Sequence, residues 1–506
     1  MEPLPTHIDV AIVGAGFAGL GMAIELKQAG RDDFVVLERA EEVGGTWQAN
    51  TYPGCQCDVP SNLYSFSFAP NPGWSKTFAM QPEIWDYLRK VADDFGIRPR
   101  IRLGCEVEGC TWDEAAMRWR IETSSGELTA RVLVAGAGGI CEPSIPSLPG
   151  LDSFEGAAFH TARWDHDHDL AGKCVAVVGT GASAIQVVPH IQTLAGKLSV
   201  FQRTPPWIMP HPGRPVRAAE KRLFRRLPLV QKAVRGAVYW GRELYVVPFK
   251  RRRFRRFPER MALRHLAKQV TDPELRAKLT PDYEIGCKRI LLSDEYYPAL
   301  QRPNVELVTE AVVEVRPRSV ITADGREHPV DTIVWGTGFR VTEMPFSHLV
   351  RGRAGRCLGD LWREHGVQGL RGTTMAGFPN LFMLVGPNTG LGHNSIVFMI
   401  ESQLAYAMDA LRTMDARGAA VFDVRPEAQT AFNEQLQARM RGTVWTEGGC
   451  ASWYLDEHGR NTTLWPGTSW SFRQATRRFD PAEYVLESDP LDQRPSSETA
   501  AAAHSH

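Results

Sequence analysis

The chain lacks several features that would assign it to whole classes of protein. None of its apolar runs approaches the roughly 20 residues that cross a bilayer, so no membrane span is expected. Its 58 basic and 58 acidic residues balance, which argues against nucleic acid as a partner. The N-terminus has no basic stretch followed by an apolar segment, so we expect no signal peptide. Nine irregularly spaced cysteines favour a reducing cytoplasm over a disulfide framework.

Two pairs of cysteines lie close together in the sequence. Cys55 and Cys57 are too close for the C-x2-C spacing of zinc sites. Cys105 and Cys110 have the spacing of some flavin disulfide reductases, but they lie in a segment that resembles strand and turn. We therefore expect all four to be structural thiols.

At 506 residues the chain is long enough for two or three domains. The first signal within it is a dinucleotide fingerprint: an apolar strand (residues 8–13), then Gly14-x-Gly16-x-x-Gly19 and a helical pattern. A second strand ends in Glu38. The glycines allow a tight turn and close approach to a pyrophosphate, and the acid is placed for a ribose 2′-hydroxyl. This pattern predicts FAD.

A second fingerprint follows the strand at 175–178, with Gly179-x-Gly181-x-x-Ala184 and a helix. The next strand ends in Arg203, 24 residues after Gly179, the same spacing that separates Gly14 from Glu38. A base in place of the acid suits a 2′-phosphate, so this site predicts NADPH, with Thr204 as a second phosphate contact. The alternative is a surface arginine that happens to end a strand.

Two more glycine-ended strands, at 131–139 and 331–339, resemble crossing points between domains. We therefore predict an α/β protein with two Rossmann-like dinucleotide-binding domains, the NADP domain being inserted into the FAD domain. The FAD domain takes residues 1–145 and 335–506, and the NADP domain takes 146–334. A helical insertion at about 210–285 completes the NADP domain.

This insertion is strongly basic. Between residues 214 and 264 there are 17 Lys or Arg and 3 acids, interleaved with aromatics, which indicates amphipathic helices. Two interpretations stay open: a solvated basic face, or weak association with a membrane surface or another anionic partner.

The segment FEGAAFHTARWDHDHDL (154–170) is rich in His and Asp and invites interpretation as a metal or acid–base site. The loop after Glu38 carries Gly44-Gly45, then Thr46 and Trp47, which we expect against the flavin, and a turn that delivers Asp58. A dithiol reductase has a Cys-x4-Cys pair in that loop, and none is present. A flavin reduced by NADPH without such a pair has molecular oxygen as its obvious electron acceptor.

The sequence resembles the type I Baeyer–Villiger monooxygenases, within the flavin-containing monooxygenases. Their identifying stretch F-x-G-x3-H-x3-W-[P/D] is matched from Phe154 through His160 to Trp164-Asp165, and G-G-x-W-x4-[FY]-P-G-x3-D is matched from Gly44 to Asp58. The resemblance covers most of the chain, least well in the basic insertion and the last 30 or so residues. It implies that His160 is a linker residue that couples domain movement to catalysis and that this segment ligates no metal.

The resemblance also implies the chemistry and the remaining site residues. In the family, NADPH reduces FAD, and a C4a-peroxyflavin then attacks a ketone to give an ester or lactone. By this resemblance Arg289 and Asp58 are catalytic, Lys288 contacts NADPH, and Trp453 in a mobile loop covers the nicotinamide nucleotide. The alternative for Trp453 is a buried structural tryptophan. The alternative for Lys288-Arg289 is a solvent-exposed basic pair. Further cofactor contacts implied are Tyr64, Val107, Ser183 and Gln186, with Gly386-Pro387-Asn388 as a flavin-proximal loop.

The sequence thus predicts a cytoplasmic ketone monooxygenase that uses FAD, NADPH and O2 on a hydrophobic substrate. Oxygenation of sulfur or nitrogen is the alternative chemistry, and a non-catalytic flavin sensor is the alternative class. Asp58 and the Trp164-Asp165 ending favour the ketone reaction. Which ketone is used and how many subunits assemble stay open.

Overall fold

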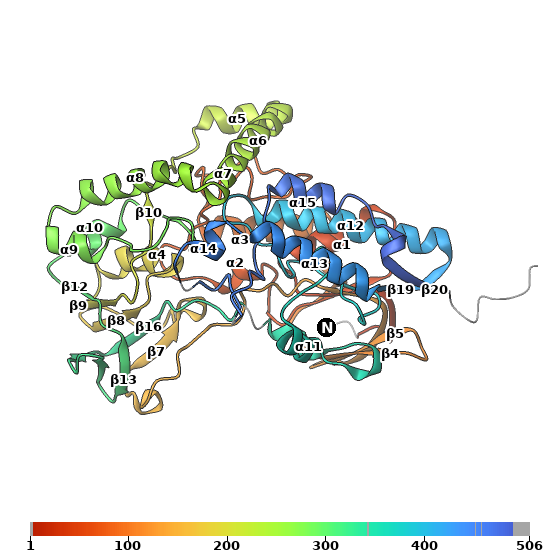
Figure 1. The fold of residues 1–506 in the computed structure, drawn as a ribbon, viewed down its shortest axis with the longest axis horizontal. Helices are drawn as coiled ribbons and strands as arrows, with labels where there is room; N and C mark the ends of the chain where they lie inside the picture. Colours follow the sequence, from red (N-terminus) through yellow and green to blue (C-terminus); the bar gives the residue numbers. More distant parts are fainter. Residues whose placement is uncertain (1–3, 342–343, 451, 457, 489–506) are drawn as a thin grey trace, which may run out of the picture.

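A computed structural model describes residues 4–341, 344–450, 452–456 and 458–488. Two sheets with parallel strands lie side by side, and helices cover both (Figure 1). The larger sheet has eight strands in the order β17-β4-β5-β6-β1-β2-β3, with β18 paired to β6. Its strands are β1 (His7–Val13), β2 (Phe34–Leu37), β3 (Ile101–Arg102), β4 (Val107–Asp113), β5 (Arg118–Thr123), β6 (Gly126–Ala135), β17 (Val350–Arg351) and β18 (Leu381–Met383).

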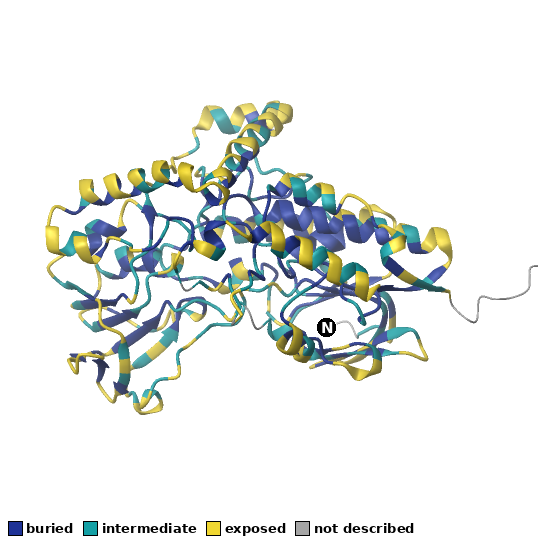
Figure 2. Ribbon diagram, in the orientation of Figure 1, coloured by how far each residue is buried: buried dark blue, intermediate teal, exposed yellow. Residues whose placement is uncertain are grey.

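The apolar runs of β1, β2 and the end of β6 are buried, as expected for central parallel strands covered on both faces. Helix α1 (Phe17–Gln28) is apolar all round because it lies between this sheet and the long helix α12 (Ile396–Arg417). Both helices are largely dark blue, hence buried, in Figure 2. The remaining helices of this part are α2 (Thr46–Ala49), α3 (Gln81–Asp94), α11 (Leu358–His365), α13 (Pro426–Met440), α14 (Val444–Glu447) and α15 (Ser469–Ala475).

The second sheet has five parallel strands in the order β12-β9-β8-β16-β7. A three-stranded antiparallel sheet, β13-β14-β15, follows β12 in sequence. The strands are β7 (Ala157–His160), β8 (Cys174–Val178), β9 (Lys197–Phe201), β12 (Val305–Val308), β13 (Val312–Arg316), β14 (Ser319–Thr322), β15 (Glu327–Pro329) and β16 (Thr332–Trp335). Helices α4 (Ala182–Ile191) and α10 (Tyr296–Leu300) pack against each other beside this sheet.

The basic insertion is helical, as predicted. Its five helices are α5 (Ala218–Arg226), α6 (Pro228–Glu243), α7 (Val246–Lys250), α8 (Arg252–Gln269) and α9 (Pro273–Lys278). The two-stranded pair β10 (Ile208–Met209) and β11 (Leu291–Leu292) flanks the insertion in sequence. Helices α5 and α6 stand out at the top of the view in Figure 1. Among the described residues, none of the helices combines the length and the apolar character that crossing a bilayer requires.

After β16 the chain returns to the larger sheet. Leu381 to Met383 of β18 pair in parallel with Leu133 to Ala135 of β6, and β19 (Ala419–Val424) with β20 (Tyr484–Ser488) forms an antiparallel ribbon beyond α12. The fold is therefore one Rossmann-like domain inserted into another, the arrangement that the order of the two fingerprints predicted. Short 3-10 turns at 98–100, 151–153, 161–163, 345–349, 353–355 and 481–483 complete the chain.

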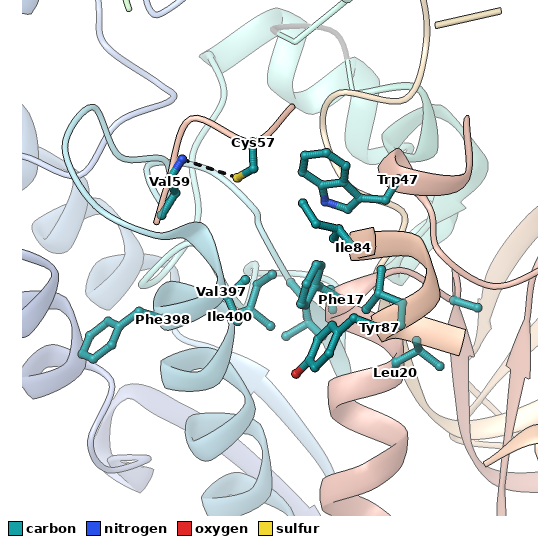
Figure 3. Packing of buried hydrophobic residues seen from close by; sticks show 14 of the residues in the cluster. Phe17, Leu20, Trp47, Cys57, Val59, Ile84, Tyr87, Val397, Phe398 and Ile400 are labelled. Carbon is teal, nitrogen blue, oxygen red and sulfur yellow. Dashed lines mark hydrogen bonds between the residues drawn. The ribbon is translucent and has the colours of Figure 1, made fainter. Parts of the chain in front are cut away.

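The largest hydrophobic core joins α1, α3 and α12 to the loop that precedes Asp58. Figure 3 shows Phe17 and Tyr87 facing Val397 and Ile400 across this core, with Trp47 above them. The Phe17 and Tyr87 rings lie 6.2 Å apart. Because the core reaches from the first helix to the twelfth, it holds the loop of residues 44–58 against the C-terminal third of the chain.

Candidate active site

The first glycine loop has the close contacts that its fingerprint requires. Gly14 has a φ of +94°, and a Cβ added there would lie 2.8 Å from the Gly136 carbonyl oxygen. A Cβ on Gly19 would lie 1.8 Å from the Gly14 oxygen, so only glycine lets α1 begin this close to β1. The N-terminus of α1 therefore faces the space beyond the strand ends, where a pyrophosphate binds in this fold.

Glu38 and the double glycine lie beside that helix end. The Glu38 carboxylate accepts hydrogen bonds from the amides of Ala15 (2.6 Å) and Ala40 (2.9 Å). Gly45, with a φ of +53°, lies against Gly16, since a Cβ added to it would be 3.1 Å from the Gly16 Cα. Bare backbone therefore lines this loop, which suits an extended dinucleotide held at close range.

The aromatic residues predicted near the flavin contact one another. Trp47 is buried, and its indole Nε1 donates a 3.1 Å hydrogen bond to the Tyr64 hydroxyl. The two rings lie 5.5 Å apart in an edge-to-face arrangement. Thr46 is the first residue of α2, and Val107 is the buried first residue of β4.

The second glycine loop repeats the first. Gly179 has a φ of +111°, and a Cβ on it would lie 2.4 Å from the Gly336 oxygen. Gly181 precedes α4, and Ser183 lies in the first turn of that helix. Two residues after β9, Arg203 is exposed, and the Thr180 hydroxyl bonds to the Thr204 carbonyl beside it (3.1 Å).

Arg203 and Lys288 bring two positive charges together at this end of the sheet. Burial lowers the pKa of Lys288, and the nearby Arg203 charge lowers it further. The Lys288 Nζ lies 5.1 Å from the centre of the Tyr283 ring. Among the described residues neither cation lies within salt-bridge distance of an acid, and the more distant Asp282 only partly opposes the fall in the Lys288 pKa. Two neighbouring unpaired cations favour an anionic ligand.

Gln186 joins the two halves of the site. Its side-chain oxygen accepts from the Tyr52 hydroxyl (2.9 Å) and the Gln56 amide (3.2 Å), and its amide donates to the Gln56 carbonyl (3.0 Å). Gly54 lies so close to α4 that a Cβ on it would be 2.3 Å from the His190 ring. The turn that delivers Asp58 is thus fastened to the first helix of the smaller sheet.

Asp58 and Arg289 form a bidentate pair across 231 residues of sequence. Arg289 Nε and Nη2 each donate a 2.6 Å hydrogen bond to one Asp58 oxygen, and Nη1 reaches the Leu391 carbonyl at 3.5 Å. Burial acts to raise the pKa of Asp58, but Arg289 holds it below its ordinary value; Asp58 in turn raises the pKa of Arg289. Both groups are therefore charged, and the guanidinium is held in one orientation.

Sequence reasoning missed two residues beside this pair. Arg242, near the end of α6, also lowers the pKa of Asp58, and its own pKa is lowered by burial while Asp58 opposes that shift. Its Nε is buried without a hydrogen-bond partner among the described residues. Tyr454 is buried, and burial raises its pKa to about 12 while Arg289 acts against the rise. Arg242 was hidden in the basic run, where nothing distinguishes a buried arginine from exposed ones.

A disulfide joins Cys287 to Cys450, a bond that the sequence analysis, which favoured a reducing compartment, did not anticipate. It links the residue before Lys288-Arg289 to the loop that carries Trp453. The side chain of Trp453 is 45% exposed and its ring lies 4.4 Å from that of Tyr454, so the buried alternative for Trp453 is wrong. Cys55, Cys57, Cys105 and Cys110 are free and buried, as predicted.

A buried polar network ties α6 to the residues just before α12 and to the start of α15. One Glu243 oxygen accepts from Asn394 (2.5 Å) and from the Ser469 amide (3.1 Å) and hydroxyl. The other oxygen lies 3.7 Å from His393 Nε2. Burial acts to raise the pKa of Glu243, and its His393 and Ser469 contacts hold it below the ordinary value. In the flavin-proximal loop itself, Asn388 donates to the carbonyls of residues 461 and 464.

The histidine-rich segment lies at the junction of the domains. His160 ends β7, is buried, and accepts through Nδ1 from the Ala162 amide (3.1 Å). Burial lowers its pKa to about 4. His166 contacts Thr51 and His168 contacts Thr332, so the three rings face different partners. Among the described residues, the group of potential metal ligands found lies elsewhere, at His348, Cys357 and Asp360.

Comparison with known proteins agrees with this geometry. The family model for pyridine nucleotide-disulphide oxidoreductases matches residues 11–225. A Baeyer-Villiger monooxygenase of Streptomyces coelicolor is 53% identical, covering 96% of this chain and 94% of that protein. Another from Pseudomonas aeruginosa is 50% identical, covering 97% and 94%.

Solved structures are similar over the same length. Steroid monooxygenase bound to NADP has a TM-score of 0.83 and 32% identity, covering 96% of this chain and all of that one. OTEMO in complex with FAD and NADP has a TM-score of 0.84 and 27% identity, covering 95% of this chain and 99% of that one.

Two dinucleotide-binding folds that meet at one arginine–carboxylate pair define a flavin- and nicotinamide-dependent oxidoreductase. The chain belongs to the Baeyer–Villiger monooxygenases.

Proposed function

We propose that this enzyme uses NADPH and O2 to insert one oxygen atom into a hydrophobic ketone, giving an ester or lactone. The observation that carries the proposal is the Asp58–Arg289 pair, a fixed positive charge at the meeting point of the two domains. Bound FAD supplies the redox chemistry, since it takes hydride from NADPH and activates O2. The side chains supply position, charge and exclusion of water.

The larger sheet offers the groups that FAD needs. We assign the pyrophosphate to the backbone of Gly14, Gly16 and Gly19 at the N-terminus of α1, and the ribose to Glu38. Gly16 and Gly45 lie so close that a Cβ on either would contact the backbone of the other, so no side chain separates these two loops. We assign the flavin contacts to Thr46, Trp47, Tyr64 and Val107.

The smaller sheet offers the groups that NADPH needs. We assign its pyrophosphate to Gly179, Gly181 and Ser183, and its 2′-phosphate to Arg203, Thr204 and Lys288, where the two unpaired cations gather. Gln186 holds the Asp58 turn beside this coenzyme, and Trp453 covers it from the loop after the disulfide.

Arg289 is assigned the central catalytic role. Negative charge develops on oxygen during its transfer to a ketone carbonyl, and a cation held in place stabilises that charge without reorganising. Asp58 supplies the orientation through two 2.6 Å hydrogen bonds. Arg242 adds a second positive charge nearby, which offsets the charge of Asp58 and leaves the site net positive.

We also propose the domain boundaries and the location. The FAD domain takes residues 1–145 and 335–506, and the NADP domain takes 146–334. Supporting this, β6 and β18 pair with each other in the larger sheet, although the segment that forms the smaller sheet lies between them in the sequence. A cytoplasmic location fits the use of NADPH, and the seven free cysteines favour it more than the single disulfide opposes it.

The test is a panel of linear, cyclic and aryl ketones with NADPH and 18O-labelled O2, read by mass spectrometry. One labelled oxygen in an ester or lactone is expected, with one NADPH consumed per product. Sulfoxides or N-oxides without any ester would replace the proposal with heteroatom oxygenation. No oxidation of NADPH under any condition would instead indicate a flavin sensor.

A further inference from the structure

Helix α6 has large apolar side chains on its exposed side, where a surface helix usually has polar ones. Leu229, Trp240 and Leu244 are 77%, 55% and 71% exposed. Ala233 and Ala237, also exposed, lie between Leu229 and Trp240 in the sequence. The five positions 229, 233, 237, 240 and 244 are three or four residues apart, so their side chains form one apolar stripe along α6 and its C-cap. This stripe faces water.

The opposite side of α6 points into the protein and combines the buried Tyr239 ring, which stacks on Phe398 with ring centres 4.7 Å apart, with polar side chains. Gln231 is buried and donates to the Asn71 carbonyl (2.8 Å), and Arg235 donates to the Asn62 carbonyl (2.7 Å). Glu243 ends the helix in the buried network described above. These polar contacts and the Tyr239–Phe398 stack thus fix the helix so that its apolar stripe remains outside.

The neighbouring helices extend this surface. Of the seventeen large apolar side chains exposed in the described part of the chain, ten lie between residues 223 and 263. Phe257 of α8 is 73% exposed, and Trp240 contacts Trp470 of α15, with ring centres 5.9 Å apart. Figure 2 shows α5 and α8 largely in yellow, and α6 in a mixture of yellow, teal and dark blue. We call the exposed side of α5 to α8 the insertion face.

The insertion face is also the most basic part of the chain. Seventeen of the 58 basic residues and only three of the 58 acidic ones lie between residues 214 and 264. Exposed arginines lie at 222, 225 and 226 on α5, which packs against α6, and at 252, 253 and 256 on α8, which packs against α7. An apolar stripe bordered by cations matches the interfacial region of an anionic bilayer, with acyl chains beneath a layer of phosphates.

Charge also distinguishes this partner from others. A second copy of the chain would present the same basic face to itself, and a symmetric contact would place like charges together. Nucleic acid phosphates would satisfy the arginines but would leave the leucine and tryptophan stripe in water. We propose that the insertion face docks on the surface of an anionic lipid bilayer, with the α6 stripe in the interface and the arginines at the headgroup phosphates.

Docking would place the bilayer beside the active site, because α6 ends at Arg242 and Glu243. The docking itself does not depend on the proposed reaction. It can therefore be tested on the FAD-loaded enzyme without substrate.

The experiment is sedimentation with vesicles of phosphatidylcholine alone or of phosphatidylcholine mixed with phosphatidylglycerol. Binding to the anionic vesicles only, with release at high salt, is expected. The double variant Trp240→Glu/Leu244→Glu should bind about tenfold or more weakly. Leu194→Glu, a matched control at a 53% exposed leucine outside the face, should bind as the unaltered enzyme does.

Flavin absorbance and the melting temperature show that each variant is folded. A second variant, Arg222→Glu/Arg226→Glu, leaves the stripe intact and should lose the preference for anionic vesicles. Equal binding to both vesicle types, or unchanged binding of both double variants, overturns the proposal. A lack of binding to either vesicle type also overturns the proposal. Dimerisation through this face would then indicate a second copy as the partner, and binding to polyglutamate, used as a probe, would indicate an acidic protein.

Discussion

Replacing Arg289 with alanine tests the centre of the proposed mechanism. The substitution removes a cation held by two 2.6 Å hydrogen bonds to Asp58, so the site loses one preorganised stabilising group. Such a loss costs about 3–4 kcal/mol of transition-state stabilisation, or roughly a hundred- to a thousandfold in the rate of ester formation. Arg242 remains nearby and keeps the loss toward the lower end.

The fold should survive the change. The Asp58 and Arg289 side chains are 25% and 32% exposed, so leaving Asp58 unpaired costs less than the roughly 3–5 kcal/mol of a fully buried pair. Bound flavin should therefore be retained. NADPH should still be oxidised, with its electrons appearing as hydrogen peroxide because oxygen transfer to the ketone fails.

The assay follows NADPH, ester and hydrogen peroxide together. Arg289→Lys keeps a charge but not the two-point contact, and should recover part of the ester yield. Asp58→Asn keeps the shape of the partner and should lose about tenfold, since Arg289 stays but is held less firmly. Arg318→Ala, at an arginine whose side chain is 86% exposed, is the matched control. Ester formed by Arg289→Ala at the unaltered rate, without added peroxide, would refute the reasoning.

Three further expectations follow from other parts of the molecule. Arg203→Ala should raise the KM for NADPH, because it removes a charge-assisted contact worth up to roughly 2–3 kcal/mol of binding free energy, and should leave the KM for NADH nearly unchanged. Equal use of both coenzymes by the unaltered enzyme would contradict the assignment. His160, with a pKa of about 4 against 6.5 when unfolded, stays neutral when the unfolded chain takes a proton. The free energy of unfolding should thus fall by on the order of 3 kcal/mol between pH 6.5 and 4, and urea titrations of His160→Asn should lack this part of the slope. A reductant should lower the melting temperature, because the disulfide closes a loop of 163 residues and such a cross-link stabilises the fold by at most about 5 kcal/mol. The melting temperature of Cys287→Ser should not change when the reductant is added.

The fold was largely predictable because its signals are local. Each fingerprint lies within about 25 residues, and the structural reason for each glycine is a contact with the adjacent strand or turn, as for Gly14 and Gly19. Strand positions agree to within a few residues: β1 begins one residue before the predicted strand, and β6 ends at Ala135 before the predicted glycines. The insertion of one domain into the other followed from the order of these local signals.

The site was predicted less completely because it is assembled over long distances. The resemblance to the family named Asp58 and Arg289, which do pair. Nothing local marks Arg242 as the buried member of a basic run, or Glu243 as the anchor of α6. The Cys287–Cys450 bond spans 163 residues, and spacing alone does not distinguish such a pair from free thiols.

The interruption of the larger sheet has a consequence for how the chain is made. β18 and α12, which complete the sheet and cover α1, begin about 250 residues after β6 ends. At a synthesis rate of about 5–20 residues per second, helix α1, which ends at Gln28, waits roughly 18–75 s for its covering helix, which begins at Ile396. The smaller sheet is complete once β16 leaves the ribosome, before β18 exists. The nicotinamide half can thus form during translation, while the flavin half waits for the last third of the chain. A ribosome stalled after β16 would therefore carry a folded coenzyme domain together with an apolar sheet edge that needs a chaperone.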